Sequence, residues 1–191
     1  AFLALHFLPE LALLVHAPFA QNEVENARNL AQSLRVGMKL YVKEHPAMVG
    51  YRTRAFYRAL LQIPNIVLLP PQIRATDIIR NASLVATITG MVGLEASLFG
   101  KPVITMGNVL FNRFSNVRRI HAQDDLPSVV KELLTTPPSN DDEVVRFVAA
   151  ILEDGVRVDI TYLWNLEWDM QTIRKELEPY VARIAEKISY A

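Results

Sequence analysis

The sequence contains no cysteine among its 191 residues. This absence excludes disulfide bonds and thiolate metal sites, and it fits a reducing compartment. No apolar run is long enough to span a membrane, and Pro9 and Glu10 interrupt the apolar N-terminus before it could serve as a signal sequence. Acidic and basic residues number 20 each, so the formal net charge is zero and no nucleic-acid partner is expected. Any anion must therefore be bound by local groups.

The motifs of several common sites are also lacking. The seven glycines form neither a GxGxxG fingerprint nor a Walker loop. The four histidines do not have the spacing of metal ligands, and no Asp-x-Asp pair follows an expected strand. We therefore expect no metal ion and no cofactor.

What is present is 51% hydrophobic residues, in short apolar runs that alternate with helical patterns. This alternation predicts an α/β protein with a Rossmann-like parallel sheet flanked by helices. The expected strands cover Phe2–Phe7, Lys39–Lys43, Ile66–Leu69, Leu84–Ile88 and Val103–Met106. The expected helices between them cover Asn22–Leu34, Thr53–Gln62, Thr76–Asn81 and Val92–Phe99.

The pattern turns helical toward the C-terminus, with segments expected at Leu126–Leu133, Asp142–Glu153 and Asp169–Ser189. Pro179 should kink the last of these helices. We expect a single domain over residues 1–191, with an α/β core over 1–110 and a mainly helical C-terminal part over 111–191.

The stretch from Leu84 to Gly107 predicts a strand, a glycine turn, a helix and a second strand. The unpaired backbone N–H groups and the positive dipole end of this helix would face the carboxyl edge of the sheet, where ligands of open α/β sheets bind. Gly90 and Gly93 would let the backbone approach an anion, and Glu95 would follow about one turn into the helix. The alternative is an ordinary crossover whose glycines serve packing only.

A second candidate group is Lys43-Glu44-His45-Pro46, at the end of another expected strand. Pro46 biases His45 toward an extended conformation and stops the strand, so the imidazole would lie at the ligand edge and could donate to a phosphate oxygen. Lys43 would add positive charge, and Arg52 and Arg54 lie in the following loop. A strand-end histidine that is merely solvated is the alternative.

A third candidate group is His6 with Glu10, at the end of the first expected strand. A histidine and a carboxylate at the ligand edge could act as an acid/base pair or bind sugar hydroxyls. The alternatives are a hydrogen-bonded core histidine and a glutamate that caps a loop.

In this order, the three groups resemble the capsule polysaccharide biosynthesis family of bacterial glycosyltransferases, whose members have the two-domain GT-B fold. Leu8 and Met91 depart from this pattern, because the family commonly has a glutamine and a small hydroxyl residue there. The resemblance covers roughly the first 110 residues. It rests on His6-Phe-Leu-Pro9-Glu10, Val42-Lys-Glu-His45-Pro46, Asn65-Ile-Val-Leu-Leu69, Thr87-Ile-Thr-Gly90 through Gly93-Leu-Glu95-Ala96, and Gly100-Lys-Pro-Val103.

The resemblance implies that the chain is the donor-binding, C-terminal half of a GT-B enzyme. The ribose would contact Glu95, as at the matching position of similar UDP-N-acetylglucosamine 2-epimerases. The catalytic base or nucleophile of such enzymes usually comes from the N-terminal half, so the resemblance assigns no nucleophile to this chain. The catalytic residue is unknown, and His6 and Glu10 are the candidates from the residue pattern alone. The nucleotide phosphates would lie at Lys43, His45, Thr89, Gly90, Met91, Val92 and Gly93.

The implied activity is transfer of a sugar from a CMP- or UDP-sugar onto a capsule or surface polysaccharide. The chain begins with Ala1 instead of methionine, and we expect it to be a piece of a longer protein whose N-terminal half binds a polysaccharide or glycolipid acceptor. The isolated fragment should then be inactive. The expected location is cytoplasmic, at the inner face of the bacterial inner membrane, with peripheral membrane association of the full-length protein. A sugar-nucleotide epimerase-like enzyme and a non-catalytic nucleotide-binding domain remain open as alternatives.

Overall fold

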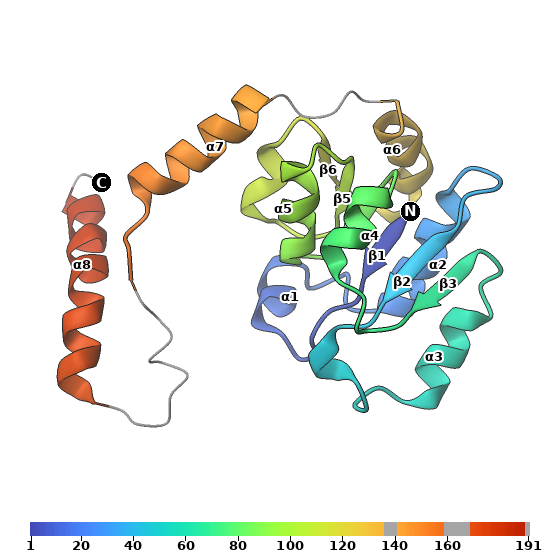
Figure 1. The fold of residues 1–191 in the computed structure, drawn as a ribbon, viewed down its shortest axis with the longest axis horizontal. Helices are drawn as coiled ribbons and strands as arrows, with labels where there is room; N and C mark the ends of the chain where they lie inside the picture. Colours follow the sequence, from blue (N-terminus) through green and yellow to red (C-terminus); the bar gives the residue numbers. More distant parts are fainter. Residues whose placement is uncertain (136–140, 159–168, 190–191) are drawn as a thin grey trace. The chain divides into compact units, whose positions relative to one another are not determined.

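The computed structural model describes residues 1–135, 141–158 and 169–189. The chain divides into two compact units, Ala1–Asn140 and Asp141–Ala191. The first unit holds a six-stranded sheet in which every strand runs parallel to its neighbours (Figure 1). The predicted Rossmann-like sheet flanked by helices is therefore confirmed.

The strands of the first unit are β1 (Phe2–Ala4), β2 (Leu40–Lys43), β3 (Ile66–Leu69), β4 (Val85–Thr87), β5 (Val103–Thr105) and β6 (Val117–Arg119). Its α-helices are α1 (Leu11–His16), α2 (Glu23–Ser33), α3 (Arg54–Leu61), α4 (Ala75–Asn81), α5 (Met91–Leu98) and α6 (Leu126–Leu133). Three short 3-10 helices lie between them, η1 (Pro46–Met48), η2 (Leu110–Arg113) and η3 (Gln123–Asp125).

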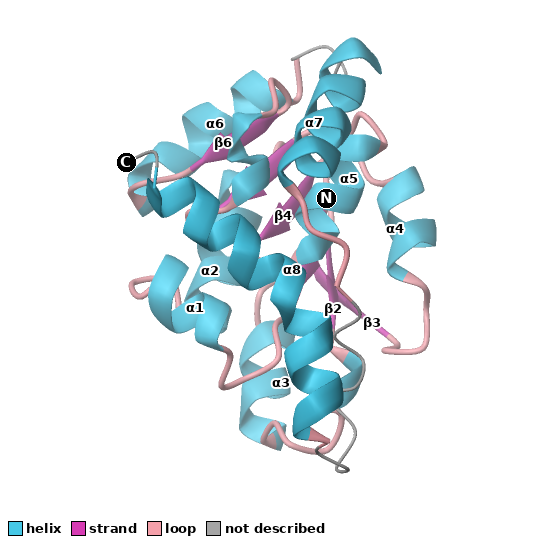
Figure 2. Cartoon of the chain, turned by 90° about the vertical axis from the view of Figure 1, so that its left-hand side faces the viewer, coloured by secondary structure: helices cyan, strands magenta, loops and turns pink. Residues whose placement is uncertain are grey.

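The strand order is β3-β2-β1-β4-β5-β6. The chain starts in the middle of the sheet at β1, builds outward to β3, and then returns to build β4, β5 and β6 on the other side. Helices α2, α3 and α6 cover one face, and α4 and α5 cover the other (Figure 2). The order reverses between β1 and β4, and such a reversal leaves a crevice at the carboxyl ends of the strands.

The strands are covered on both faces, which explains why the sequence shows continuous apolar runs instead of alternation. Phe2, Leu40, Val85 and Ile104, from four different strands, are all 0% exposed. These side chains belong to the interior that holds the strands together. The same packing fixes the positions of the carboxyl ends of the strands, where a ligand would bind.

The first strand is shorter than expected, because β1 ends at Ala4 and not at Phe7. The N–H of Leu5 still donates to the Lys43 carbonyl at 2.9 Å, but the N–H of His6 donates to the Glu23 carboxylate at 2.7 Å. The backbone therefore leaves the β-sheet hydrogen-bond ladder at His6, where the Glu23 side chain of α2 is the acceptor in place of a carbonyl of the neighbouring strand.

The sequence analysis missed α1 and β6, which have six and three residues. The six residues of α1 give little periodicity, and β6 contains two arginines and so lacks the apolar run that marks the other strands. Because β6 covers Val117–Arg119 and pairs with β5, the sheet extends beyond the expected core limit at residue 110. The single domain over residues 1–191 remains a prediction.

The second unit contains α7 (Asp141–Asp154) and α8 (Met170–Ser189), as the helical pattern predicted. Asp154 pairs with Arg183 at 3.2 Å and with Lys187 at 2.8 Å, which joins the end of α7 to α8. Helix α8 continues through Pro179, and the kink expected there remains a prediction. None of the helices in the described part of the chain has the length and apolar character needed to cross a membrane.

Candidate functional site at the reversal of strand order

A pocket of about 540 Å³ opens where the strand order reverses, beside the carboxyl ends of β1, β2 and β4. The loop after β3 and the start of α4 close its far side. This is the place where open α/β sheets bind ligands. The polar and charged residues of its lining are His6, Glu10, Lys43, His45, Gln72, Arg74, Thr87 and Glu95.

The start of α5 forms one wall of the pocket. Gly90 is its N-cap residue and no side chain caps the helix; the Gly93 N–H donates to the Gly90 carbonyl at 3.0 Å, which leaves the N–H groups of Met91 and Val92 at the helix start as donors for a ligand. Met91 and Val92 of this turn line the pocket. A Cβ on Gly90 would lie 2.8 Å from Thr87 Oγ1 and 3.2 Å from His6 Nε2, so only glycine brings the turn this close to β1. The wall therefore offers backbone donors at the positive end of a helix dipole.

His45 forms the facing wall and is fixed by its neighbours. Its Nδ1 accepts a hydrogen bond from the Ala47 N–H at 3.2 Å, and its own N–H donates to Glu44 Oε1 at 2.7 Å. Its ring lies 5.9 Å from the Phe7 ring, centroid to centroid. An accepting Nδ1 requires the ring hydrogen of a neutral imidazole to lie on Nε2. His45 therefore presents Nε2–H as its hydrogen-bond donor.

Two cationic and two acidic side chains complete the lining: Lys43, Arg74, Glu10 and Glu95. Lys43 is 7% exposed; burial lowers its pKa, and the nearby charge of Glu44 offsets part of this lowering. A bound anion would act in the same direction as Glu44 and favour the charged amine. Glu95 is exposed on α5, where its carboxylate can accept hydrogen bonds from hydroxyl groups.

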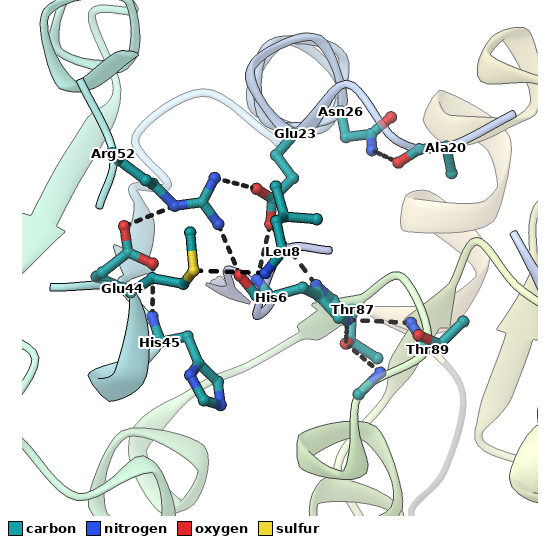
Figure 3. Close-up of polar contacts among 12 residues, drawn as sticks. His6, Leu8, Ala20, Glu23, Asn26, Glu44, His45, Arg52, Thr87 and Thr89 are labelled. Carbon is teal, nitrogen blue, oxygen red and sulfur yellow. Dashed lines mark hydrogen bonds and ion pairs between the residues drawn. The ribbon is translucent and has the colours of Figure 1, made fainter. Parts of the chain in front are cut away.

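His6 is 4% exposed, and its ring ties β1 to the turn before α5 (Figure 3). Its Nε2 accepts from the Thr89 N–H at 3.2 Å and lies 3.3 Å from Thr87 Oγ1. Because Nε2 accepts, the hydrogen of the neutral ring lies on Nδ1, which is 3.7 Å from Glu23 Oε1. The Gly90 N–H in turn donates to Thr87 Oγ1 at 2.9 Å. The imidazole therefore supports the glycine turn from behind.

Behind His6 lies a buried charge cluster of Glu23, Arg52 and Glu44 (Figure 3). The Arg52 guanidinium pairs with Glu23 Oε2 through Nη1 and with Glu44 Oε2 through Nε, the latter at 2.8 Å. Its Nη2 donates to the His6 carbonyl at 2.7 Å. The three side chains are only 3 to 7% exposed. Two buried carboxylates thus share one guanidinium as their cation.

Burial, hydrogen bonds and the charge of Arg52 together set the pKa values of Glu23 and Tyr57 in this cluster. Burial raises the pKa of Glu23, but hydrogen bonds from His6 and the charge of Arg52 outweigh it and leave the pKa below the usual 4.5. The Tyr57 hydroxyl donates to Glu44 Oε2 at 2.7 Å, and burial together with this bond raises its pKa to about 12. Because Glu44 also accepts the His45 N–H, the cluster positions both histidines.

Most of the sequence-predicted site residues meet at this pocket: His6, Glu10, Lys43, His45, Gly90, Met91, Val92 and Glu95. Thr89 and Gly93, both described, are not among the lining residues. The Thr89 N–H is used by His6, and a Cβ on Gly93 would lie 2.7 Å from the Phe111 ring. Gly93 therefore allows α5 to pack closely, and a phosphate contact at Thr89 or Gly93 remains a prediction.

The structure adds partners that the sequence did not specify for two residues. Arg52, which the sequence placed in the loop after His45, has its guanidinium against the carboxylates of Glu23 and Glu44. The carboxylate next to the His6 ring belongs to Glu23, and the hydrogen bonds of that ring agree with the alternative of a hydrogen-bonded core histidine. Nothing in the sequence distinguishes Glu23 from an ordinary acidic residue in the first turn of a helix. A catalytic role for His6 and Glu10 remains a prediction.

Among the residues that the structure describes, no group of three or more histidine, aspartate or glutamate side chains is arranged to hold a metal ion.

A Rossmann-like sheet with a pocket at the reversal of strand order defines the class of protein, namely one half of a GT-B-like fold. The structure is similar to two solved transferases from Thermosulfurimonas dismutans, the KpsC beta Kdo 2,7 transferase and the KpsC beta Kdo 2,4 transferase. The first aligns with a TM-score of 0.52 and 17% identity over 78% of this chain and 52% of that chain. The second aligns with a TM-score of 0.52 and 15% identity over 77% of this chain and 51% of that chain. At these identities the similarity shows the fold alone.

The model of the capsule polysaccharide biosynthesis protein family matches residues 10–116. Because this match covers more than half of the sequence, the chain belongs to that family, as the resemblance indicated. No curated protein sequence matches the chain. The chain spans about half the length of the two solved transferases.

Proposed function

We propose that this chain is the donor-binding half of a bacterial glycosyltransferase, which moves a sugar from a CMP- or UDP-sugar onto a capsule or surface polysaccharide. The observation that carries the proposal is the pocket in which the start of α5 and the Nε2–H of His45 can meet one anion. Family membership and the fold shared with the two Kdo transferases support it.

The proposed chemistry is stabilisation of the leaving group. As the glycosidic bond breaks, negative charge accumulates on the nucleotide phosphate, and donors already aimed at that position lower the barrier. The N–H groups of Met91 and Val92 and the His45 imidazole would supply these donors, and Lys43 would add positive charge. The donors are preorganised, because Ala47 and Glu44 fix His45 while His6 fixes the turn before α5.

The proposal assigns the ribose to Glu95, on the exposed side of α5. The acceptor and the catalytic base are assigned to the rest of the full-length enzyme, so the isolated chain should bind nucleotide without transferring sugar. We also propose that the full-length protein acts at the inner face of the bacterial inner membrane.

His45→Ala should weaken nucleotide binding by about 1 to 3 kcal/mol, because it removes one charge-assisted hydrogen bond to phosphate. Calorimetric titration with CMP, UDP and GDP measures this loss and also identifies the preferred nucleotide. Arg54→Ala is a control, since Arg54 is exposed at the start of α3 and is not among the residues lining the pocket.

Thermal melting of the His45→Ala variant separates a binding role from a structural one. A lower melting temperature with unchanged affinity of the folded protein would make His45 a structural residue only. Failure of the unmodified chain to bind any of the three nucleotides would reject the proposed function.

Glu95→Gln should weaken binding of ribonucleotides by about 1 to 3 kcal/mol, since the amide keeps the shape of the side chain and loses the charged acceptor. The same variant should bind 2′,3′-dideoxynucleotides almost as well as the unmodified chain does, because these ligands lack the hydroxyl groups. Titration of both ligand types into both proteins gives the comparison. Equal losses for the two types would make Glu95 a surface carboxylate with no role in ribose binding.

A further inference from the structure

A second pocket, of about 440 Å³, lies beside the carboxyl ends of β5 and β6. Its walls come from the loop over residues 16–20, from Met106 after β5, and from residues 119–123 at and after the end of β6. We propose that this pocket binds the anionic group of a sugar, either a carboxylate or a phosphate carried on a monosaccharide unit. The assignment of the ligand as a sugar rests on the proposed function, whereas the assignment of an anion rests on the pocket itself.

The polar groups of this lining favour an oxyanion. The lining residues with polar side chains are Arg119, His16, His121 and Gln123. A guanidinium fork matches the planar arrangement of two oxyanion oxygens, and each imidazole can donate a further hydrogen bond. The pocket therefore concentrates donors from two separate chain segments.

None of the described residues that line the second pocket carries a carboxylate. Asp124 and Asp125 follow directly in the sequence, but Asp125 accepts the Ala122 N–H at 3.0 Å as part of the turn into α6. The lining thus differs from that of the first pocket, where Glu10 and Glu95 accompany the cationic groups.

The rest of the lining is apolar and suits the carbon face of a sugar ring. Pro18, Phe19, Met106 and Ile120 contribute to it, and Phe19 is 101% exposed. A phenylalanine that buries none of its ring in the chain's own core offers a free face to a ligand. Binding sites commonly combine such apolar walls with a few polar groups that fix the orientation of the ligand.

The walls of the second pocket are tied to each other, so the pocket is preformed. Asn26 of α2 is 3% exposed; its Nδ2 donates to the Ala20 carbonyl at 2.7 Å, and its Oδ1 accepts from Gln123 Nε2 at 3.2 Å (Figure 3 shows the first of these bonds). The Asn108 N–H donates to the His16 carbonyl at 2.9 Å, which holds the 16–20 loop against the end of β5. Three hydrogen bonds thus connect the segments that supply the charged groups.

The two pockets share no lining residue, yet both lie at the carboxyl edge of one sheet. A ligand in the second pocket would leave the nucleotide pocket unobstructed. The two sites can therefore be tested separately on the same protein.

Nuclear magnetic resonance titration of the whole chain tests the proposal, with glucuronate, glucose 6-phosphate and unmodified glucose as probes. The imidazole signals of His16 and His121 report on the second pocket, and that of His45 reports on the first. We expect at least one of the two anionic sugars to shift the His16 and His121 signals with at least about tenfold higher affinity than glucose, the equivalent of one charge-assisted hydrogen bond. Glucuronate binding identifies a carboxylate site, and binding of glucose 6-phosphate alone identifies a phosphate site.

Arg119→Gln should lower the affinity for the anionic sugar by about tenfold, since it keeps a polar side chain and removes the charge. Arg35→Gln is the matched control, because Arg35 is also exposed but lies in the turn before β2, outside the second pocket. Phe19→Ala provides a second variant whose side chain is fully exposed, and it should also weaken binding. Circular dichroism confirms that each variant is folded.

Equal affinity for glucose and both anionic sugars, no shift with any probe, or unchanged affinity in Arg119→Gln would overturn the proposal. A nucleotide titration on the same sample separates this outcome from failure of the proposed function. Anionic sugar bound without any nucleotide binding would reject the donor-site assignment and retain the second pocket. Nucleotide binding without binding of any anionic sugar would reject the second pocket and retain the donor-site assignment.

Discussion

Arg52→Met should lower the free energy of unfolding by about 3 to 5 kcal/mol, the usual cost of removing one partner from a buried ion pair. Methionine fills similar space, so the loss comes mainly from the carboxylates of Glu23 and Glu44, which would remain buried without their cation. Urea unfolding followed by circular dichroism gives the free energy. Arg54→Met, two residues away at an exposed position, should change it by no more than about 0.5 kcal/mol.

The pH dependence of the same variant tests the cause of the loss. The pKa of Glu23 lies below its usual 4.5 in the folded chain, so the unfolded chain binds more protons there as the solution is acidified. Its stabilising contribution is therefore complete above about pH 4.5 and is lost as the pH falls through the lowered pKa. Without Arg52 the pKa of Glu23 should rise, and part of the lost stability should return in acid as the carboxylate is neutralised.

The double variant Arg52→Met with Glu23→Gln gives a further comparison. It removes one unpaired charge, so it should lose less stability than the sum of the two single variants. An additive loss would mean that the cluster contributes through packing and not through charge pairing.

His6→Phe should lower the free energy of unfolding by about 2 to 4 kcal/mol, because the ring is kept but the acceptor of the Thr89 N–H is removed in a buried place. His6→Gln can retain an acceptor and should lose less. His121→Phe, at an exposed position, should change the free energy of unfolding by no more than about 0.5 kcal/mol. Amide hydrogen exchange adds a local measurement, since the Thr89 N–H should exchange faster in His6→Phe.

These measurements separate a structural role of His6 from a catalytic one. If His6 supports the glycine turn, His6→Phe will lose stability and also bind nucleotide more weakly, because the turn before α5 loosens. An unchanged free energy of unfolding with unchanged Thr89 exchange would contradict the hydrogen bonds described here. His6 would then be tested as an acid/base residue of the proposed transferase.

Local patterns in the sequence were sufficient to predict the parallel sheet and the place of its pocket. Short apolar runs separated by helical segments allow few arrangements other than a sheet covered on both faces. Because the carboxyl ends of parallel strands meet at one edge, His45 after β2 and Gly90 after β4 could be placed together without knowing any distance. Helix α1 escaped prediction because six residues give no clear period, and β6 escaped because two of its three residues are arginines and it lacks an apolar run.

The sequence by itself determined the fold class and brought His45, Gly90 and Glu95 to one edge. Only the tertiary structure decided which groups surround His6 and Arg52, because all of their named partners except Glu44 lie far away in the chain. The His6 ring meets Thr89, 83 positions on, and the Arg52 guanidinium reaches back 46 positions to the His6 carbonyl. Such contacts follow from the packing of α2, η1 and the β4–α5 turn around β1, and no local spacing encodes them. Burial decides which charges pair. A carboxylate such as Glu23 that is removed from water is destabilised unless the fold places a cation beside it.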